Sequence, residues 1–165
     1  MPFVADNVSG LQVYYTEKAA NFTATPASAF SGLASLATPT PRVTFNAAGA
    51  LRLDFGFEHA AWFEFTSTDL ADGATDVMAA ISEYNEPWQV RAKLAPLTPY
   101  ADGVYRLQTN PQLYEGVRFA WIFFERKPDS KRKREPLAPW TLSGLRLVSQ
   151  STRELVDSVP ALGCL

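Results

Sequence analysis

Two glutamates three residues apart, Glu83 and Glu86, are candidates for chemistry in this sequence, within the segment 83–88 (EYNEPW). Two carboxylates held about 5–9.5 Å apart act as acid and base in glycoside hydrolysis. A proline follows them and disfavours a helix, so the spacing does not place both on one helical face. The pattern favours a plainer interpretation, a strand-end loop whose Asn85 and glutamate side chains satisfy backbone donors while Tyr84 and Trp88 pack.

Another polar segment lies inside the stretch 105–125 (YRLQTNPQLYEGVRFAWIFFE). Its first residues alternate apolar and polar, which is the period of a strand with one buried face. The short segment 110–116 carries a proline and a glycine, so we expect a compact connection that turns Tyr114 and Glu115 outward. The strand that follows has apolar residues on both faces, from Phe119 to Phe124, and we expect both of its faces to be covered.

Three aspartates, Asp69, Asp72 and Asp76, are spaced closely enough to suggest calcium, which prefers oxygen ligands. Their spacing lacks the order of an EF-hand loop, so a surface turn is the favoured interpretation. The sequence has one histidine, His59, and one cysteine, Cys164, which excludes multi-histidine metal sites and an internal disulfide. We expect a structural or surface role for His59 and no cofactor.

A basic run, 126–134 (RKPDSKRKR), contains six basic residues and one acidic residue. Such clusters attract phosphate backbones, so a nucleic-acid patch or a nuclear-targeting signal is one interpretation. The rest of the chain is acidic, with 9 basic and 16 acidic residues remaining, and Pro128 and Pro136 are typical of loop borders. We therefore favour a solvated loop, and nucleic acid is not the expected partner.

The composition favours one folded domain of the all-β class. The chain has 165 residues, of which 47% are hydrophobic, 13% aromatic and 19% charged. Strand-like patterns fill its middle, whereas long amphipathic helical patterns are scarce. No basic segment followed by an apolar run begins the sequence, and no stretch approaches about 20 apolar residues. We therefore expect an antiparallel, jelly-roll-like β-sandwich that is soluble and has no secretory signal.

The chain divides into three parts: residues 1–41 as a short strand (11–15) and a Pro-rich arm or loop (19–41), residues 42–150 as the sandwich with 126–136 as a loop insertion, and residues 151–165 as a tail. A brief helical turn is expected within 27–36.

The first strands of the sandwich, 42–45 and 51–55, are predicted to form a hairpin. Gly56 should end the second strand and 57–61 should bulge before 62–66 resumes the sheet. Further strands are predicted at 77–82 and 140–150.

Four segments together resemble the amino-terminal β-sandwich region of fungal α-L-rhamnosidase-like glycoside hydrolases. They are LRLDFGFEHAAWFEF (51–65), ISEYNEP (81–87), the stretch 105–125 and PWTLSGLRLVSQ (139–150). The resemblance covers about residues 51–150. The basic run departs from it as an insertion, and the chain ends soon after residue 150, where the family continues into a catalytic α/α barrel.

The resemblance implies a jelly-roll-like accessory module that packs against that barrel. Because the acid and base of such enzymes lie on the barrel, it assigns no catalytic role to Glu83, Glu86 or Glu115. We therefore expect a non-catalytic module, whether fragment or short product. The segment 83–88 and the Tyr114-Glu115 corner would contact the barrel or the edge of a rhamnose-containing glycan.

Two alternatives stay open. One is a free-standing carbohydrate-binding module, in which Trp62, Trp88, Tyr84 and Tyr114 are the available aromatic platforms for sugar rings. The other is an interaction protein that uses the basic run.

Overall fold

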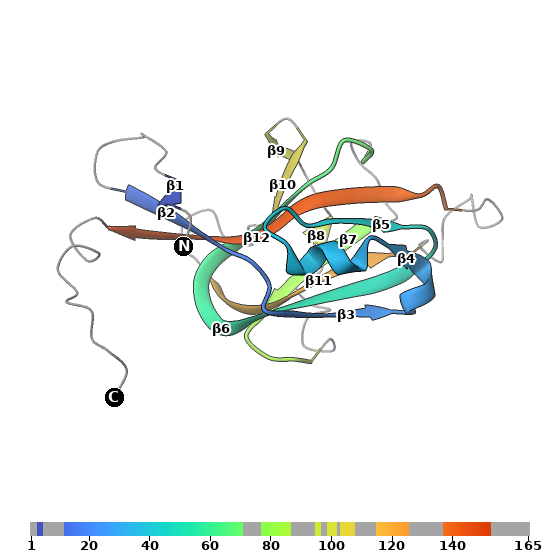
Figure 1. Ribbon diagram of the computed structural model, residues 1–165. Helices are drawn as coiled ribbons and strands as arrows, with labels where there is room; N and C mark the ends of the chain where they lie inside the picture. The colour runs from blue at the N-terminus through green and yellow to red at the C-terminus, as the bar shows by residue number, and fades with distance from the viewer. Residues whose placement is uncertain are drawn as a thin grey trace.

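The computed structural model describes residues 3–4, 12–70, 77–86, 95–96, 99–101, 103–107, 115–125 and 137–152 (Figure 1). These residues form β-strands and two short 3₁₀-helices, and the strand pairs are antiparallel. The prediction of an all-β, antiparallel fold is confirmed, whereas the jelly-roll-like sandwich order stays a prediction. In the described part of the chain, no helix is long and apolar enough to cross a membrane.

The elements follow one another along the chain with short connections where these are described. The strands are β1 (Phe3–Val4), β2 (Gln12–Glu17), β3 (Asn21–Thr25), β4 (Phe30–Ser31), β5 (Arg42–Phe45), β6 (Gly49–Thr66), β7 (Val77–Ser82), β8 (Ala95–Pro96), β9 (Pro99–Ala101), β10 (Val104–Leu107), β11 (Glu115–Phe124) and β12 (Trp140–Thr152). The 3₁₀-helices are η1 (Ala27–Ala29) and η2 (Leu33–Ala37).

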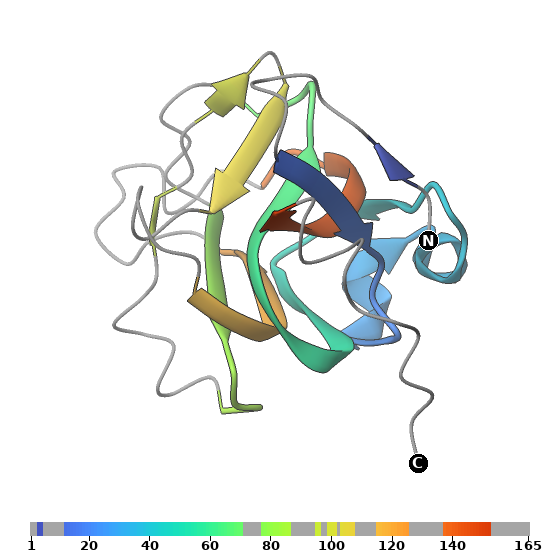
Figure 2. The ribbon, with the colours of Figure 1, turned by 90° about the vertical axis from the view of Figure 1, so that its left-hand side faces the viewer.

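Strand β6 organises the sheet because its 18 residues are enough to pair with four other strands. Its first half pairs with β3 on one side and β11 on the other, and its second half pairs with β12 and β10. In Figure 1 the first half lies along the lower side beside β3, bends at the left, and leads toward β12 on the upper side. Figure 2 shows the strands arranged around a common interior.

The stretch predicted as two strands, 105–125, follows one edge of β6 along most of its length. Tyr105 of β10 pairs with Phe65 of β6, and Phe119 of β11 pairs with Asp54 of β6. Both strands therefore run antiparallel to β6, one after the other. Tyr105 is buried, as expected. Both faces of β11 are also buried, which confirms that prediction, with Phe119 and Trp121 on one face and Ala120, Ile122 and Phe124 on the other.

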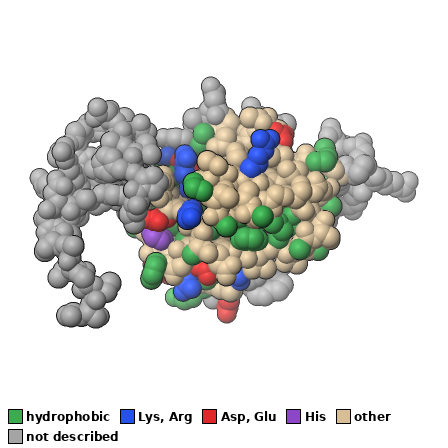
Figure 3. Space-filling model, viewed as in Figure 1, with side chains coloured by type: hydrophobic (Ala, Val, Ile, Leu, Met, Phe, Trp, Pro, Cys, Tyr) green, Lys and Arg blue, Asp and Glu red, His purple; other side chains and the backbone are tan. Residues whose placement is uncertain are grey.

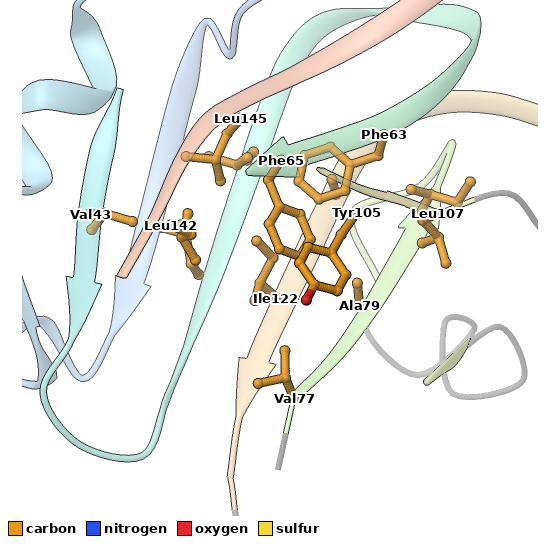
Figure 4. Packing of buried hydrophobic residues seen from close by; sticks show 14 of the residues in the cluster. Val43, Phe63, Phe65, Val77, Ala79, Tyr105, Leu107, Ile122, Leu142 and Leu145 are labelled. Carbon is orange, nitrogen blue, oxygen red and sulfur yellow. The ribbon is translucent and has the colours of Figure 1, made fainter. Parts of the chain in front are cut away.

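The core lies between the two halves of the bent sheet and is rich in aromatic rings. Figure 4 shows side chains from β5 and β12 gathered with those from β6, β7, β10 and β11. The ring of Phe65 stacks on Tyr105, with centroids 5.5 Å apart, and meets Trp140 edge-on at 5.9 Å. The Trp140 indole N–H donates to Ser67 Oγ at 2.8 Å, so its polar atom is satisfied inside the core.

Several sequence-based predictions are corrected. The hairpin of 42–45 with 51–55 is wrong, because β5 pairs with β12 and β4 instead. The arm 19–41 contains β3, η1, β4 and η2, of which β3 pairs with β6, so it is part of the sheet rather than a loop. Gly56 does not end a strand, and the last strand continues to Thr152.

Candidate functional site

A bulge in β6 sets the position of the candidate site. Asp54 pairs with Phe119 and His59 with Val117, so residues 55–58 of β6 all lie opposite one residue of β11. Gly56 has φ +84°, a conformation that a side chain would strain, and its N–H donates to Asp54 Oδ1 at 2.9 Å. A bulge is therefore present, but it spans 55–58 rather than the predicted 57–61, because residues 59–61 pair in register with β11.

Two carboxylates meet over Gly116, at the start of β11. A Cβ on Gly116 would lie 2.5 Å from Glu58 Oε1 and 2.6 Å from Glu83 Oε1, so both oxygens occupy the space beside its backbone. Glu58 comes from the bulge and Glu83 from the end of β7, and both are exposed. Within the described residues neither carboxylate has an ion-pair or hydrogen-bond partner. The carboxylate that the structure brings to Glu83 is therefore Glu58, a residue that the sequence did not single out.

Arginines lie beside this pair, on the outer face of the sheet. Arg118 contacts Asp54 through its Nε at 3.3 Å, and its guanidinium lies over the ring of Phe119, 4.9 Å from the centroid. Arg52 donates to Asn85 Oδ1 at 2.6 Å and to Thr23 Oγ1 at 2.8 Å. The Arg52 bond fixes the loop after β7 to β6, which lies on the other side of β11, so Asn85 binds a side chain rather than the backbone donors that were expected.

Two large apolar side chains are exposed next to the carboxylates. Phe57 is 79% exposed and Tyr84 is 60% exposed, and each is the chain neighbour of one of the two glutamates. The expectation that Tyr84 packs is therefore wrong. Its backbone N–H is held by Ser82 Oγ at 3.0 Å, so the loop is anchored by its backbone while the ring faces solvent. We call this region the bend surface: Arg52, Asp54, Phe57, Glu58, Glu83, Tyr84, Asn85, Gly116 and Arg118.

The other predicted site residues divide between described and undescribed parts of the chain. Trp88, Tyr114, Asp72 and Asp76 lie outside the described residues, as does the basic run 126–134. Glu86 is exposed in the loop after β7, and the backbone of Glu115 pairs with Ala61.

The remaining calcium candidate has a structural role. Asp69 accepts hydrogen bonds from Thr68 Oγ1 at 2.7 Å and from the backbone N–H of Thr141 at 3.1 Å. The carboxylate therefore joins a turn to β12. In the part of the chain that the structure describes, no group of three or more His, Cys, Asp or Glu residues is placed to hold a metal ion.

A second polar cluster, the Glu64 network, lies across three strands on the opposite face from the core. Glu64 is 3% exposed, and Arg106 of β10 and Arg146 of β12 are its direct cross-strand neighbours. Arg106 contacts Glu64 Oε1, and Arg146 contacts Glu64 Oε2 at 3.1 Å. The guanidinium of Arg106 also lies over the half-buried ring of Trp62, 4.2 Å from the centroid. A cation therefore covers one face of Trp62, which the sequence offered as a sugar platform.

The described side chains on the face in Figure 3 carry charges of both signs. On this face, Lys and Arg side chains are mixed with Asp and Glu, and hydrophobic side chains lie between them.

No protein-family model, curated protein or solved structure matches this chain.

Proposed function

We propose that this chain is the non-catalytic accessory β-domain of an α-L-rhamnosidase-like glycosidase and that the bend surface docks onto the catalytic α/α barrel, which the printed sequence does not include. One observation carries this proposal: three of the segments that resemble that family, 51–65, 81–87 and 105–125, converge on the bend surface. They supply Glu58, Glu83 and Gly116, which are in contact although distant in sequence.

The exposed aromatic rings favour docking over catalysis. Phe57 and Tyr84 flank the carboxylates and expose more than half of their surface. Clustered apolar groups rimmed by polar residues are typical of interaction surfaces. Arg52, Arg118 and the two glutamates supply such a rim. Glu58 and Glu83 lie on the open surface beside these rings, whereas catalytic carboxylate pairs work inside a water-excluding cleft.

The test combines the chain with a purified α/α-barrel catalytic domain of a rhamnosidase. We expect no aryl-rhamnoside hydrolysis by the chain alone and a measurable association with the barrel domain by calorimetry. Phe57→Ser and Tyr84→Ser should each weaken that association by about tenfold or more, because apolar anchors dominate interface energies.

Tyr84→Phe is the matched control, since it keeps the ring and removes only the hydroxyl, and it should bind like the parent chain. Two results would contradict the proposal. One is aryl-rhamnoside turnover by the chain alone that Glu83→Gln abolishes. The other is barrel binding that neither serine variant changes.

A carbohydrate-binding module is the second candidate, and the exposed ring of Tyr84 is the observation that favours it. An open aromatic face beside Glu83 and Asn85 has the chemistry of a sugar platform, in which the ring stacks on the sugar while polar groups bind its hydroxyls. We expect titration with rhamnose-containing oligosaccharides to show saturable binding that Tyr84→Ala removes, if this function holds. If the titration shows no binding at high sugar concentration, docking remains the proposed function of the bend surface.

A further inference from the structure

A pocket of about 470 Å³ opens where two strands leave part of the edge of β12 uncovered. Strand β6 pairs with one edge of β12, at residues 143–149. On the other edge, β5 pairs with residues 140–143 and β2 with residues 147–152. Residues 144–146 therefore lie in the gap between β5 and β2. The volume of the pocket lies within the range of small-molecule sites, about 300–1,000 Å³.

The lining combines apolar and charged groups. Pro39 supplies exposed apolar surface beside the buried Pro41 and Leu145, and Glu17, Lys18 and Arg146 supply charge. Together with the adjoining Glu64 network, the pocket has three cations and two carboxylates, which leaves one net positive charge. Lys18 is exposed and has no ion-pair partner within the described residues.

Arg146 is held in place with one side of its guanidinium uncommitted. Its Nε and Nη2 donate to Glu64 Oε2 at 3.3 and 3.1 Å, and Glu64 is fixed from its other side by Arg106. No described residue accepts from Nη1, and 42% of the side chain is exposed. The Nη1–Nη2 edge of a guanidinium matches the two oxygens of a carboxylate. Because Glu64 already orders this side chain, binding would cost little additional side-chain entropy.

We propose that this pocket binds a polyhydroxylated carboxylate of about monosaccharide size, such as a sugar acid. The carboxylate pairs with Arg146 and Lys18, and Glu17 accepts hydrogen bonds from hydroxyl groups. The C–H face of the ring lies on the exposed Pro39. This site is separate from the bend surface and does not depend on the proposed docking function.

The test compares D-glucuronate with D-glucose, which differ only by a carboxylate in place of a hydroxymethyl group. In titrations followed by NMR, we expect saturable binding of glucuronate and at least tenfold weaker binding of glucose, because hydrogen bonds to charged groups contribute about 1.5–3 kcal/mol. Methyl β-D-glucuronoside and a glucuronate-terminated disaccharide distinguish a free sugar acid from a residue at the end of a glycan.

Variants locate the site. Lys18→Ala changes an exposed side chain and should weaken glucuronate binding by about tenfold, as should Arg146→Gln, whose fold is checked by circular dichroism. Tyr84→Ser on the bend surface should leave glucuronate binding unchanged. Equal binding of glucose and glucuronate would overturn the proposal. So would loss of binding in Tyr84→Ser, or unchanged binding in Lys18→Ala.

Discussion

Replacing Phe65 by alanine is expected to lower the free energy of unfolding by about 3–5 kcal/mol. The side chain is 1% exposed and lies where β6, β10 and β12 meet. Its ring contacts those of Phe63, Tyr105 and Trp140, with centroids 5.5–6.0 Å away. The alanine variant therefore loses the transfer energy of the ring and leaves a cavity among rigid neighbours. Urea denaturation followed by tryptophan fluorescence measures the change.

Phe57→Ala is the matched control because it removes the same side chain from the same strand. Phe57 is 79% exposed, so its loss should change the free energy of unfolding by no more than about 0.5 kcal/mol. Similar losses in both variants would mean that Phe57 is packed, and the assignment of the bend surface as an exposed surface would then be wrong.

The local alternation of residues was enough to predict the strands that carry the core. In 62–66 every second residue enters the core, which places Phe63 and Phe65 inside and leaves Glu64 on the other face. The same period holds for Tyr105 and Leu107. The alternation of apolar and polar residues is a property of each strand's own sequence, so the face that enters the core can be predicted without knowing the strand's neighbours.

Strand pairing could not be read in the same way. The apolar residues of 42–45 and 51–55 with a turn-like segment between them indicate a hairpin, yet Thr44 pairs with Thr141, and their hydroxyls are 2.9 Å apart. The connection between β5 and β6 instead carries the chain from one half of the bent sheet to the other. A turn signal shows where a strand ends, but the partner is decided by which apolar faces close the core.

Only part of the candidate site could be predicted, because local composition is visible in the sequence whereas strand pairing is not. The loop 83–86 stands out by composition, and the structure places Glu83 against Gly116, a contact that the sequence did not predict. Glu58 was missed because its position depends on four residues of β6 opposing one of β11. The available signal was Asp54-Phe55-Gly56, in which an aspartate and a glycine two residues later are typical of a bulged turn.

The Glu64 network was also missed, because an acidic residue on the outer face of a strand is normally solvated. Its burial comes from neighbours distant in sequence: the register places Arg106 and Arg146 on either side of Glu64. Both arginines lie at the outward positions of alternating strands, which is the signal that the sequence offered. Cross-strand pairs of opposite charge stabilise a sheet, and burial makes the loss of one partner costly.

Glu64→Gln is therefore expected to lower the free energy of unfolding by about 3 kcal/mol. Glutamine keeps the shape of the side chain and one acceptor oxygen, so the change isolates the charge. The Arg106 side chain is 13% exposed and would lose its carboxylate in a poorly solvated place. Because water and salt ions reach this pair poorly, the loss should persist in 1 M NaCl, measured by urea denaturation.

Asp54→Asn supplies the matched control on the bend surface, where Arg118 contacts Asp54 Oδ1 at 3.3 Å. The side chains of this pair are 19% and 44% exposed, so the isosteric change should cost less than about 1 kcal/mol and become smaller in 1 M NaCl. The double variant Glu64→Gln/Arg106→Gln should recover part of the stability lost in Glu64→Gln. It also removes the Arg106 guanidinium, which Glu64→Gln leaves without its carboxylate. If Glu64→Gln behaved like Asp54→Asn in both salt conditions, the Glu64 network would be a solvated surface pair, and the ordered Arg146 of the pocket would lose its support.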